Sequence, residues 1–362
     1  MRGISSLRKF ALGALGCALF SHQTLAATSE LAFSRNARTF ETTQSSLLAK
    51  GMAHACLTSL LPDSLPCNPA LTALIKKPRL SATGLLSNGY PTLERMKKLL
   101  GGDIQQETID ALFSSERVLQ VEANAELAFS AKNLSAKYTP LAVRYFSVIR
   151  NETNPDVELY AVEEKNFTAQ TGFEVLRRVY AGLQIRHVER KFIKKRFKLF
   201  DLATPAGKDL LKSQTETITY VEPGVFTALP SEWLGDWRWR GSLMLVNGGF
   251  AQEDHPDIEA AMELQGAIGF SPPMPWGKLD IEIAYRGLTA EEEASEKFRF
   301  GGMYQFGAMS VVGGVDSEGV SGGVFHGMDQ LNAGIVYSTT QVPWRSLDYY
   351  AQTVYVQLGW QL

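Results

Sequence analysis

The sequence contains little of what an enzyme or a helical membrane protein needs. It has three cysteines and five histidines in 362 residues. It has no Gly-rich phosphate loop, C-x-x-C pair or paired-carboxylate motif, so we expect no enzyme and no bound metal or cofactor. The formal net charge of −2 indicates no nucleic-acid partner. Beyond residue 26 no apolar run approaches the ~18 residues of a transmembrane helix, so any membrane insertion must use a β-barrel.

Two short segments come closest to a chemical site. Residues 319–323 match the G-x-S-x-G pattern, but they lie in a Gly-rich antiparallel hairpin, whereas a nucleophile needs a sharp strand-to-helix turn. Residues 253–257 (Glu-Asp-His-Pro-Asp) gather metal-ligand side chains without the spacing and turn glycine typical of a calcium loop. We interpret the first segment as a hairpin and the second as a solvated loop.

The first 26 residues have the pattern of an export signal. A basic start, which includes Arg2 and Lys9, precedes a short apolar run over residues 10–20, and residues 24–26 (Thr-Leu-Ala) form a suitable cleavage site. This pattern predicts a signal peptide, which is too short to span a membrane as a helix. The alternative is a lipoprotein signal that ends before Cys17, with a very short apolar core.

Two cysteines, Cys56 and Cys67, remain after the predicted cleavage. Export leads into an oxidising compartment, in which an isolated pair so close in sequence can close a small disulfide loop. Two buried free thiols are the alternative, and the sequence leaves both open.

The chain divides into segments of different pattern. Residues 27–79 are rich in Ser, Ala and Leu and lack strand alternation, so we predict a compact segment outside the regular sheet. A short strand follows over residues 80–87. Over residues 91–116 apolar residues recur at helical spacing on both sides of Gly101-Gly102. This insert is predicted to form two short helices that cap a pore or pack beside it.

Long stretches of strict alternation dominate the rest of the chain. From residue 119 to 132 apolar and polar side chains alternate almost perfectly. This length exceeds the ~5–6 residues of an average soluble strand and suits the ~9–11 residues of a membrane strand. Residues 353–362 repeat the pattern with one apolar face. We therefore predict an all-β fold, an antiparallel transmembrane β-barrel of about 12–14 strands over residues 80–362; a soluble secreted sandwich is the alternative.

Charged residues on two neighbouring predicted strands favour a closed barrel. Asp280 and Glu282 alternate with apolar residues on one strand, and Lys297 and Arg299 do so on the next. An Arg or Lys on the lipid face at mid-bilayer costs about 2–4 kcal/mol. We therefore expect these four side chains to face the lumen and to form ion pairs across the strands.

A basic run over residues 186–198 departs from this regular pattern. We predict that it contacts an anionic surface such as lipid headgroups, and a solvated hairpin end is the alternative. The residues proposed for this contact are Arg190, Lys191, Lys194, Lys195 and Arg196.

One short motif resembles a known family. The sequence Cys67-Asn68-Pro69-Ala70-Leu71, followed by residues 77–82 (Lys-Pro-Arg-Leu-Ser-Ala), resembles the N-terminal hatch of the FadL/TodX group of long-chain fatty-acid and hydrocarbon transporters. It is also similar to the related outer-membrane family of conjugal-transfer TraF-type proteins. A helical insert like residues 91–116 and Gly-rich final hairpins like residues 313–340 are usual in that group. The resemblance is specific over about residues 50–90.

This resemblance implies a location and a function. Asn68, Pro69 and Ala70 would belong to a hatch inside the barrel, whose movement opens a route for a hydrophobic small molecule such as a fatty acid. The chain would lie in the outer membrane of a Gram-negative bacterium, in contact with its lipid, after insertion by the barrel-assembly machinery through the C-terminal strand. The alternative is a barrel that transports nothing and acts through its exposed loops. The inward residues visible in the pattern are polar, which favours a polar lumen.

Overall fold

The computed structural model describes residues 46–61, 65–102, 105–113, 118–150, 155–230, 235–251, 262–287, 297–317, 319–327, 330–344 and 347–361. All of these residues lie within one compact unit of the chain. The predicted signal peptide, the first part of the predicted hatch (residues 27–45) and the acidic loop at residues 253–257 lie outside the described residues.

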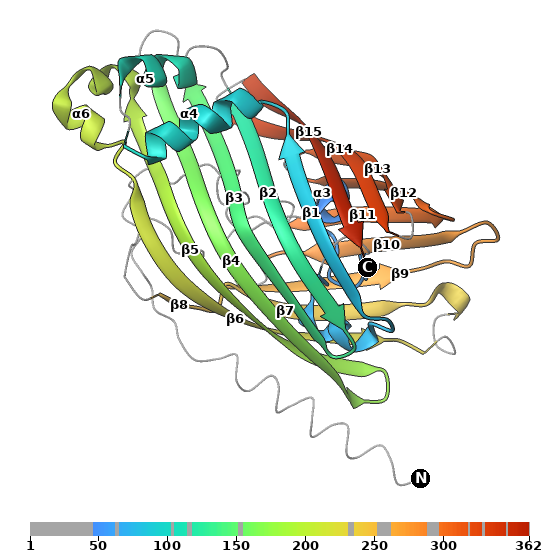
Figure 1. Ribbon diagram of the computed structural model, residues 1–362. Coiled ribbons are helices and arrows are strands. Elements are labelled where there is room, and N and C mark those ends of the chain that lie inside the picture. The colour runs from blue at the N-terminus through green and yellow to red at the C-terminus, as the bar shows by residue number, and fades with distance from the viewer. Residues whose placement is uncertain are drawn as a thin grey trace. The chain divides into compact units, whose positions relative to one another are not determined.

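Fourteen antiparallel strands close into a barrel (Figure 1), because β1 pairs with β15 and every other strand pairs with its neighbours in sequence. The predicted antiparallel barrel of 12–14 strands is thereby confirmed. A further short segment, β8, follows β7 after a break at Asn247 and pairs only with β6. The strands are β1 (Arg79–Ser87), β2 (Val118–Ala131), β3 (Leu134–Arg150), β4 (Asp156–Leu176), β5 (Val179–Lys198), β6 (Gln214–Ala228), β7 (Arg240–Val246), β8 (Gly249–Ala251), β9 (Glu263–Phe270), β10 (Lys278–Tyr285), β11 (Phe298–Phe306), β12 (Met309–Asp316), β13 (Val320–Gly327), β14 (Leu331–Trp344) and β15 (Leu347–Gln361).

The barrel wall has a tall side and a short side. Strands β2–β6 contain 14 to 21 residues, whereas β7 and β9–β13 contain seven to nine. Figure 1 shows the long strands rising together on one side of the barrel. At ~3.3 Å per residue, the longest strands extend well beyond what a bilayer crossing of ~9–11 residues requires.

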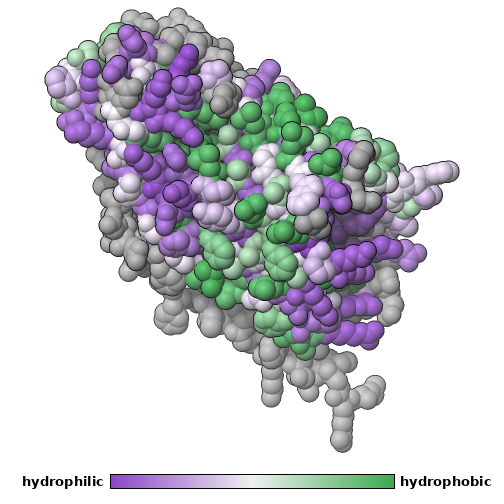
Figure 2. All heavy atoms as spheres, in the orientation of Figure 1, coloured by the Kyte–Doolittle hydropathy of each residue, from purple (hydrophilic) through white to green (hydrophobic). Residues whose placement is uncertain are grey.

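Alternation along each strand separates an inner from an outer face. On β10 the inward Asp280, Glu282 and Ala284 are buried, and the residues between them point outward because side chains alternate along a strand. The outer face exposes large apolar side chains on almost every strand. Figure 2 shows such residues gathered across the middle of one face, with hydrophilic residues towards both ends.

Two helices between β1 and β2 pack on the outer face of the tall side. They are α4 (Tyr90–Leu100) and α5 (Gln106–Phe113), and Figure 1 shows them across the ends of β2–β5. Their apolar residues, such as Met96, share a cluster with the outward-facing Val121, Tyr145 and Ile193. The helical insert therefore lies beside the wall and does not cap the lumen.

The remaining helical pieces are short connections. They are η3 (Leu199–Ala203) and α6 (Pro205–Asp209) between β5 and β6, and η4 (Gly235–Trp237) between β6 and β7. Among the described residues, no helix is long and apolar enough to cross a membrane.

The described residues between 46 and 78, called the plug below, lie inside the barrel. They contain α3 (Leu47–Gly51) and the 3-10 helix η2 (Pro69–Leu74). Apolar plug residues, such as Leu48 and Leu57, form one core cluster with inward-facing residues of the short side, such as Met303 and Val312. The plug therefore shares its core with the barrel wall and has none of its own.

Candidate functional site: the plugged lumen

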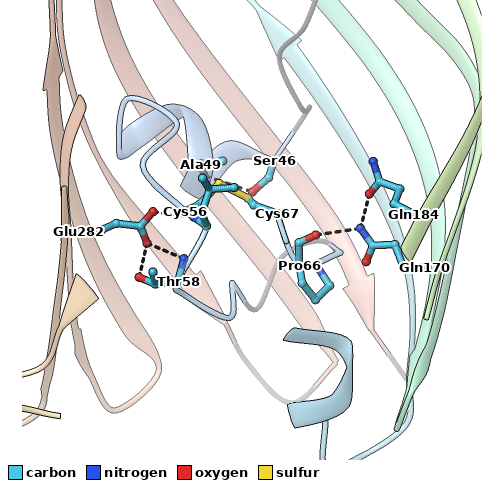
Figure 3. The surroundings of a disulfide bond; sticks show 10 residues. Ser46, Ala49, Cys56, Thr58, Pro66, Cys67, Gln170, Gln184 and Glu282 are labelled. Atoms are coloured by element: carbon cyan, nitrogen blue, oxygen red, sulfur yellow. Dashed lines mark hydrogen bonds between the residues drawn. A yellow bond between two sulfur atoms is a disulfide. The ribbon is translucent and has the colours of Figure 1, made fainter. Parts of the chain in front are cut away.

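Two buried carboxylates hold the plug from opposite sides of the barrel. Glu122 on β2 accepts a hydrogen bond from Lys50 Nζ at 2.7 Å, and both side chains are about 5% exposed. Across the lumen on β10, Glu282 accepts from the Leu57 amide at 2.6 Å and from the Thr58 amide at 2.9 Å (Figure 3). Removing either carboxylate would leave a buried plug donor without its partner, which is costly.

Asn68 joins η2 to the tall side of the wall. Its Oδ1 accepts from the Ala70 amide at 2.9 Å and so caps η2, while its Nδ2 donates to the Val225 carbonyl on β6 at 3.1 Å. Asn68 and Ala70 are fully buried, and Pro69 occupies the first position of the helix, where its missing N–H costs nothing. The three residues of the predicted hatch element therefore form one rigid contact between plug and barrel.

Glycines on the wall allow this contact. A Cβ on Gly182 of β5 would lie 2.3 Å from the Ala70 amide nitrogen, and the neighbouring Gly172 and Gly224 face residues 68–70 at similarly short range. No side chain fits at such distances, because real Cβ atoms do not approach other heavy atoms so closely. Three adjacent strands thus present a smooth surface of backbone to the plug.

A second group of small residues receives the other end of the plug. Gly301 and Gly314 pack against the backbone of Met52. The Ser321 hydroxyl donates to the Gly51 carbonyl at 3.0 Å and accepts from the Ala53 amide at 3.2 Å. The serine of the G-x-S-x-G segment therefore binds the plug backbone from an antiparallel strand.

Cys56 and Cys67 form a disulfide, with sulfurs 2.02 Å apart and Cα atoms 5.8 Å apart. Both residues are buried, at 4% and 3% exposure. Figure 3 places the disulfide in the centre of the lumen, between the Glu282 side and the Gln170 side of the wall. The bridge closes the plug between its two anchored ends.

The double variant Cys56→Ser/Cys67→Ser is expected to loosen the plug while leaving the barrel closed. A disulfide that closes a loop of this length contributes about 3 kcal/mol through the unfolded state, whereas the strand ladder does not depend on it. Amide exchange of residues 47–61 should become faster, with exchange of β10 and β11 unchanged. Equal acceleration in the strands would show that the bridge stabilises the whole barrel.

A chamber of about 120 Å³ lies between the plug and the wall. His54, Leu57, Leu65 and the disulfide line it from the plug, and strands β2–β7, β9 and β11, with Asn247 after β7 and Arg286 after β10, contribute the rest. The apolar lining residues include Leu57, Leu65, Met244 and Val246. Most others are polar or charged, with five fixed cations (Lys137, Arg144, Arg186, Arg286, Arg299) and three carboxylates (Glu122, Glu164, Glu222).

Several of these charges are paired on the wall. Arg144 forms an ion pair with Glu164, and Arg186 contacts Glu222 at 3.0 Å. Arg286 Nε contacts Glu263 at 2.9 Å. Ion pairs of this kind inside the lumen satisfy buried charges and make its surface polar. In the part of the chain that the structure describes, no three His, Cys, Asp or Glu side chains gather as a metal site would require.

The plug presents one histidine to the chamber. Burial, together with the positive charges of Arg299, Lys50 and Arg286, holds the pKa of His54 well below its ordinary value. His54 and the preceding Ala53 both have positive φ, at 61° and 49°, a conformation that costs free energy for residues other than glycine. The backbone therefore turns sharply at this point, and the histidine stays uncharged near neutral pH.

The four lumen charges predicted from the sequence lie on the inner face, but the two carboxylates have other partners than expected. Asp280 contacts Arg240 at 3.0 Å and Lys278 at 2.6 Å, and Glu282 accepts the plug amides. The strand register explains this difference. Glu282 stands opposite Gly301, whereas Arg299 stands opposite Ala284, and Lys297 lies two residues further along, beside Arg286.

The basic run on β5 does not form a single surface. Arg190 is 4% exposed and lies inside the barrel, with Glu216 at 3.2 Å, and Arg196 contacts Asp156. Lys194 shares this inner face, whereas Lys191 and Lys195 lie on the outer face, because side chains alternate along the strand. Arg190 is therefore unavailable for the predicted contact with an anionic surface.

Several residues that build the site were not identified from the sequence. Glu122 lies in the alternating segment 119–132. The alternation predicted that its side chain points inward, but no pattern indicated that Lys50 of the plug is its partner. The wall glycines Gly172, Gly182 and Gly224 stand opposite one another on three consecutive strands, but only their common contact with η2 reveals their role.

No protein-family model and no curated protein sequence matches the chain. Solved structures with a similar fold include the Pseudomonas putida toluene transporter TodX, at 8% identity and a TM-score of 0.49 over 87% of this chain and 96% of that chain. The CymD monoaromatic hydrocarbon channel matches at 9% identity and a TM-score of 0.46, over 87% and 96%. The translocator domain of the autotransporter NalP from Neisseria meningitidis matches at 10% and 0.28, over 79% and 88%. The assignment of a barrel fold depends on the strand pairing described above.

Proposed function

We propose that this chain is an integral β-barrel of a Gram-negative outer membrane, closed by its own plug, which binds a small molecule in the chamber behind that plug. The observation that carries the membrane assignment is the apolar outer face. Side chains such as Leu127, Phe167, Ile268, Ile335 and Leu358 are each 48–67% exposed. A continuous apolar outer band is what a lipid-facing barrel requires, whereas a soluble barrel would expose it to water at high cost.

Aromatic residues mark both edges of this band on the short side. At one end Tyr285 and Phe298 pack edge to face, with ring centroids 4.9 Å apart, and at the other end Tyr304 packs on Phe306 at 5.7 Å. Phe298 and Phe306 are the ends of β11, about 26 Å apart at the usual strand rise. The nine residues of β11 suit the ~9–11 residues of a tilted membrane strand, and aromatic residues at both edges are typical of the girdles of outer-membrane barrels.

A charged band marks the same boundary on the tall side. On the outer face, Glu163 of β4 stands opposite Lys191 of β5, and Lys165 stands opposite Glu189. Below them β4 exposes Phe167, Phe173 and Val175, and above them α4 and α5 cover the wall. The part of β4 below this band has about the ~10 residues of a membrane crossing, so the remainder would extend into water.

The loops indicate which end faces outward. At one end the connections include two-residue turns, as in residues 132–133 and 307–308, and the longest covers residues 229–239, whereas the other end carries α4, α5 and α6. Outer-membrane barrels have short periplasmic turns and longer extracellular loops. The tall extension with its helices would therefore lie on the extracellular side.

A hydrophobic cargo, such as a fatty acid, is the second candidate. It is favoured by the hatch element at residues 68–70 and by the apolar strip of Leu57, Leu65, Met244 and Val246 in the chamber. A barrel that carries nothing and acts only through its extracellular loops is the remaining alternative.

The membrane assignment is tested by fractionating cells and comparing boiled with unboiled samples on an SDS gel. We expect the protein in the outer-membrane fraction, with a band that shifts on boiling because a closed barrel resists the detergent. A soluble periplasmic protein without such a shift would overturn the assignment.

Asn68→Ala is expected to impair uptake of labelled oleate if the plug gates a route for hydrophobic cargo. The variant loses two buried hydrogen bonds, a cost of about 1–3 kcal/mol, and frees η2 from β6. The matched control is Asn88→Ala, which removes an exposed asparagine bonded to β15 far from η2. Oleate uptake by Asn68→Ala equal to that of Asn88→Ala and of the parent would exclude gating at this residue.

A further inference from the structure

Three polar side chains on adjacent strands of the tall side point into one part of the chamber. Asn124 on β2, Thr139 on β3 and Asn166 on β4 all line it, and Asn124 and Thr139 are only 7% and 1% exposed. Among the residues that the structure describes, Asn124 Nδ2, Thr139 Oγ1 and Asn166 Oδ1 are buried without a hydrogen-bond partner. Buried polar atoms in native proteins are nearly always hydrogen-bonded. These three atoms are therefore available to a molecule held in the chamber.

An irregularity of β3 brings these side chains together. The register between β3 and β4 shifts between Thr139 and Ala142, where Pro140 has no backbone N–H for the strand ladder. Such a bulge adds one residue to a strand, so both Thr139 and Ala142 face the lumen. Thr139 stands opposite Asn166, and Ala142 stands opposite Asn124. The small side chain of Ala142 leaves space on the wall, and the three polar groups surround it.

The charged side chains of the lining already have partners. All three carboxylates and four of the five cations form ion pairs: Lys50–Glu122, Lys137–Glu126, Arg144–Glu164, Arg186–Glu222 and Arg286–Glu263. The fifth cation, Arg299, stands opposite Asp316 of β12. An ion that entered the chamber would lose its hydration and compete with these pairs. The lining therefore favours an uncharged ligand.

The size of the chamber and its free polar atoms limit the ligand further. Its volume of about 120 Å³ is somewhat below the ~150 Å³ of an apolar cavity that holds benzene, so a long acyl chain does not fit inside. A hydrocarbon of suitable size would leave the three polar atoms unsatisfied, which is costly. A hydroxyl group both donates and accepts, so it can bond an amide N–H, an amide oxygen or the threonine hydroxyl.

We propose that Asn124, Thr139 and Asn166 bind a compact neutral polyol of about the size of glycerol. Each of the three side chains bonds a hydroxyl group of the ligand, which lies over Ala142. The ligand occupies the space between the tall side of the wall and the plug. This inference rests on the proposed binding of a small molecule in the chamber and specifies the chemical class of that molecule.

The test is saturation-transfer nuclear magnetic resonance on the detergent-solubilised full chain, purified without glycerol and then titrated with it. Two probes of similar size serve as comparisons: tert-butanol has one hydroxyl on an apolar body, and glycerate has a negative charge. We expect a saturable signal from glycerol, at the millimolar concentrations typical of so small a ligand. The other two probes should give at least ten-fold weaker binding.

The substitutions Thr139→Val and Asn124→Leu should each weaken glycerol binding by about ten-fold, because each keeps the approximate shape and removes a hydrogen-bonding group. The matched control is Thr353→Val on β15. Thr353 is 1% exposed and does not line the chamber, so glycerol binding should not change. Since Thr139 Oγ1 bonds no group among the described residues, Thr139→Val should not lower the temperature at which the barrel band shifts on an SDS gel.

Three results would overturn the proposal. Glycerol binding unchanged in both chamber variants would place it elsewhere. Saturable binding of tert-butanol or glycerate in preference to glycerol would leave the chamber as a binding site for another class of ligand. No saturable binding of any probe to a heat-modifiable barrel would indicate that water alone satisfies the three polar atoms, and would leave the membrane assignment standing.

Discussion

Ile283→Arg is expected to prevent assembly of the barrel into the outer membrane. Ile283 points outward from β10, directly opposite Ile268 of β9, which is 54% exposed. An arginine on the lipid face costs about 2–4 kcal/mol at mid-bilayer and less towards the edges. Ile283 lies two residues inside the Tyr285 edge of the band, and even ~2 kcal/mol is a large part of the ~5–15 kcal/mol that stabilises a typical folded protein. The heat-modifiable band in the outer-membrane fraction should fall by about ten-fold or more, since 1.4 kcal/mol already corresponds to a factor of ten.

The matched control is Glu282→Gln, at the next residue of the same strand but on its inner face. The substituted glutamine would keep a polar side chain inside the barrel and place no charge in lipid. Membrane assembly should therefore continue, although the side chain of residue 282 would no longer be a charged acceptor for the Leu57 and Thr58 amides of the plug. Equal tolerance of both substitutions would indicate a sheet surrounded by water.

Gly182→Val is expected to displace η2 from the wall and to open the barrel to ions. The new Cβ would lie 2.3 Å from the Ala70 nitrogen and 2.4 Å from the Pro69 carbonyl carbon. These are backbone atoms that cannot rotate away, so the plug must leave this side of the lumen. In planar lipid bilayers the parent should conduct little, and Gly182→Val should show channels of steady, larger conductance.

Gly313→Val is the control for this experiment. Gly313 lies on the outer face of β12, and a Cβ there meets no heavy atom within 4 Å. It should assemble and remain closed like the parent. A closed Gly182→Val barrel would show that the wall adjusts instead of the plug, and that η2 is not what closes the lumen.

The alternation of the sequence was a reliable guide to which way each side chain points. It predicted the inward position of Asp280 and Glu282, and the helical spacing over residues 91–116 predicted α4 and α5. The same alternation also divides the basic run of β5, since Arg190, Lys194 and Arg196 share one parity and Lys191 and Lys195 the other. The prediction of a single contact surface over residues 186–198 did not take this alternation into account.

Partners could not be read in the same way. The pairing of Glu282 with the plug, and not with Arg299, depends on a register of β10 and β11 that places Arg299 opposite Ala284. Register depends on how two strands pair, so the sequence of one strand does not determine it. The outer position of α4 and α5 depends likewise on apolar residues of β2–β5 that are left uncovered beyond the membrane band.

By itself, the sequence determined the two faces of each strand, and with them a barrel that is apolar outside and polar within, because side-chain direction follows from the local backbone period. Only the tertiary structure decided what fills the lumen. Lys50 meets Glu122, and Asn68 meets β6 beside three wall glycines, after the sheet has closed around a segment that precedes it. Contacts between residues so far apart in sequence have no local pattern, since closure of the whole barrel is what brings them together.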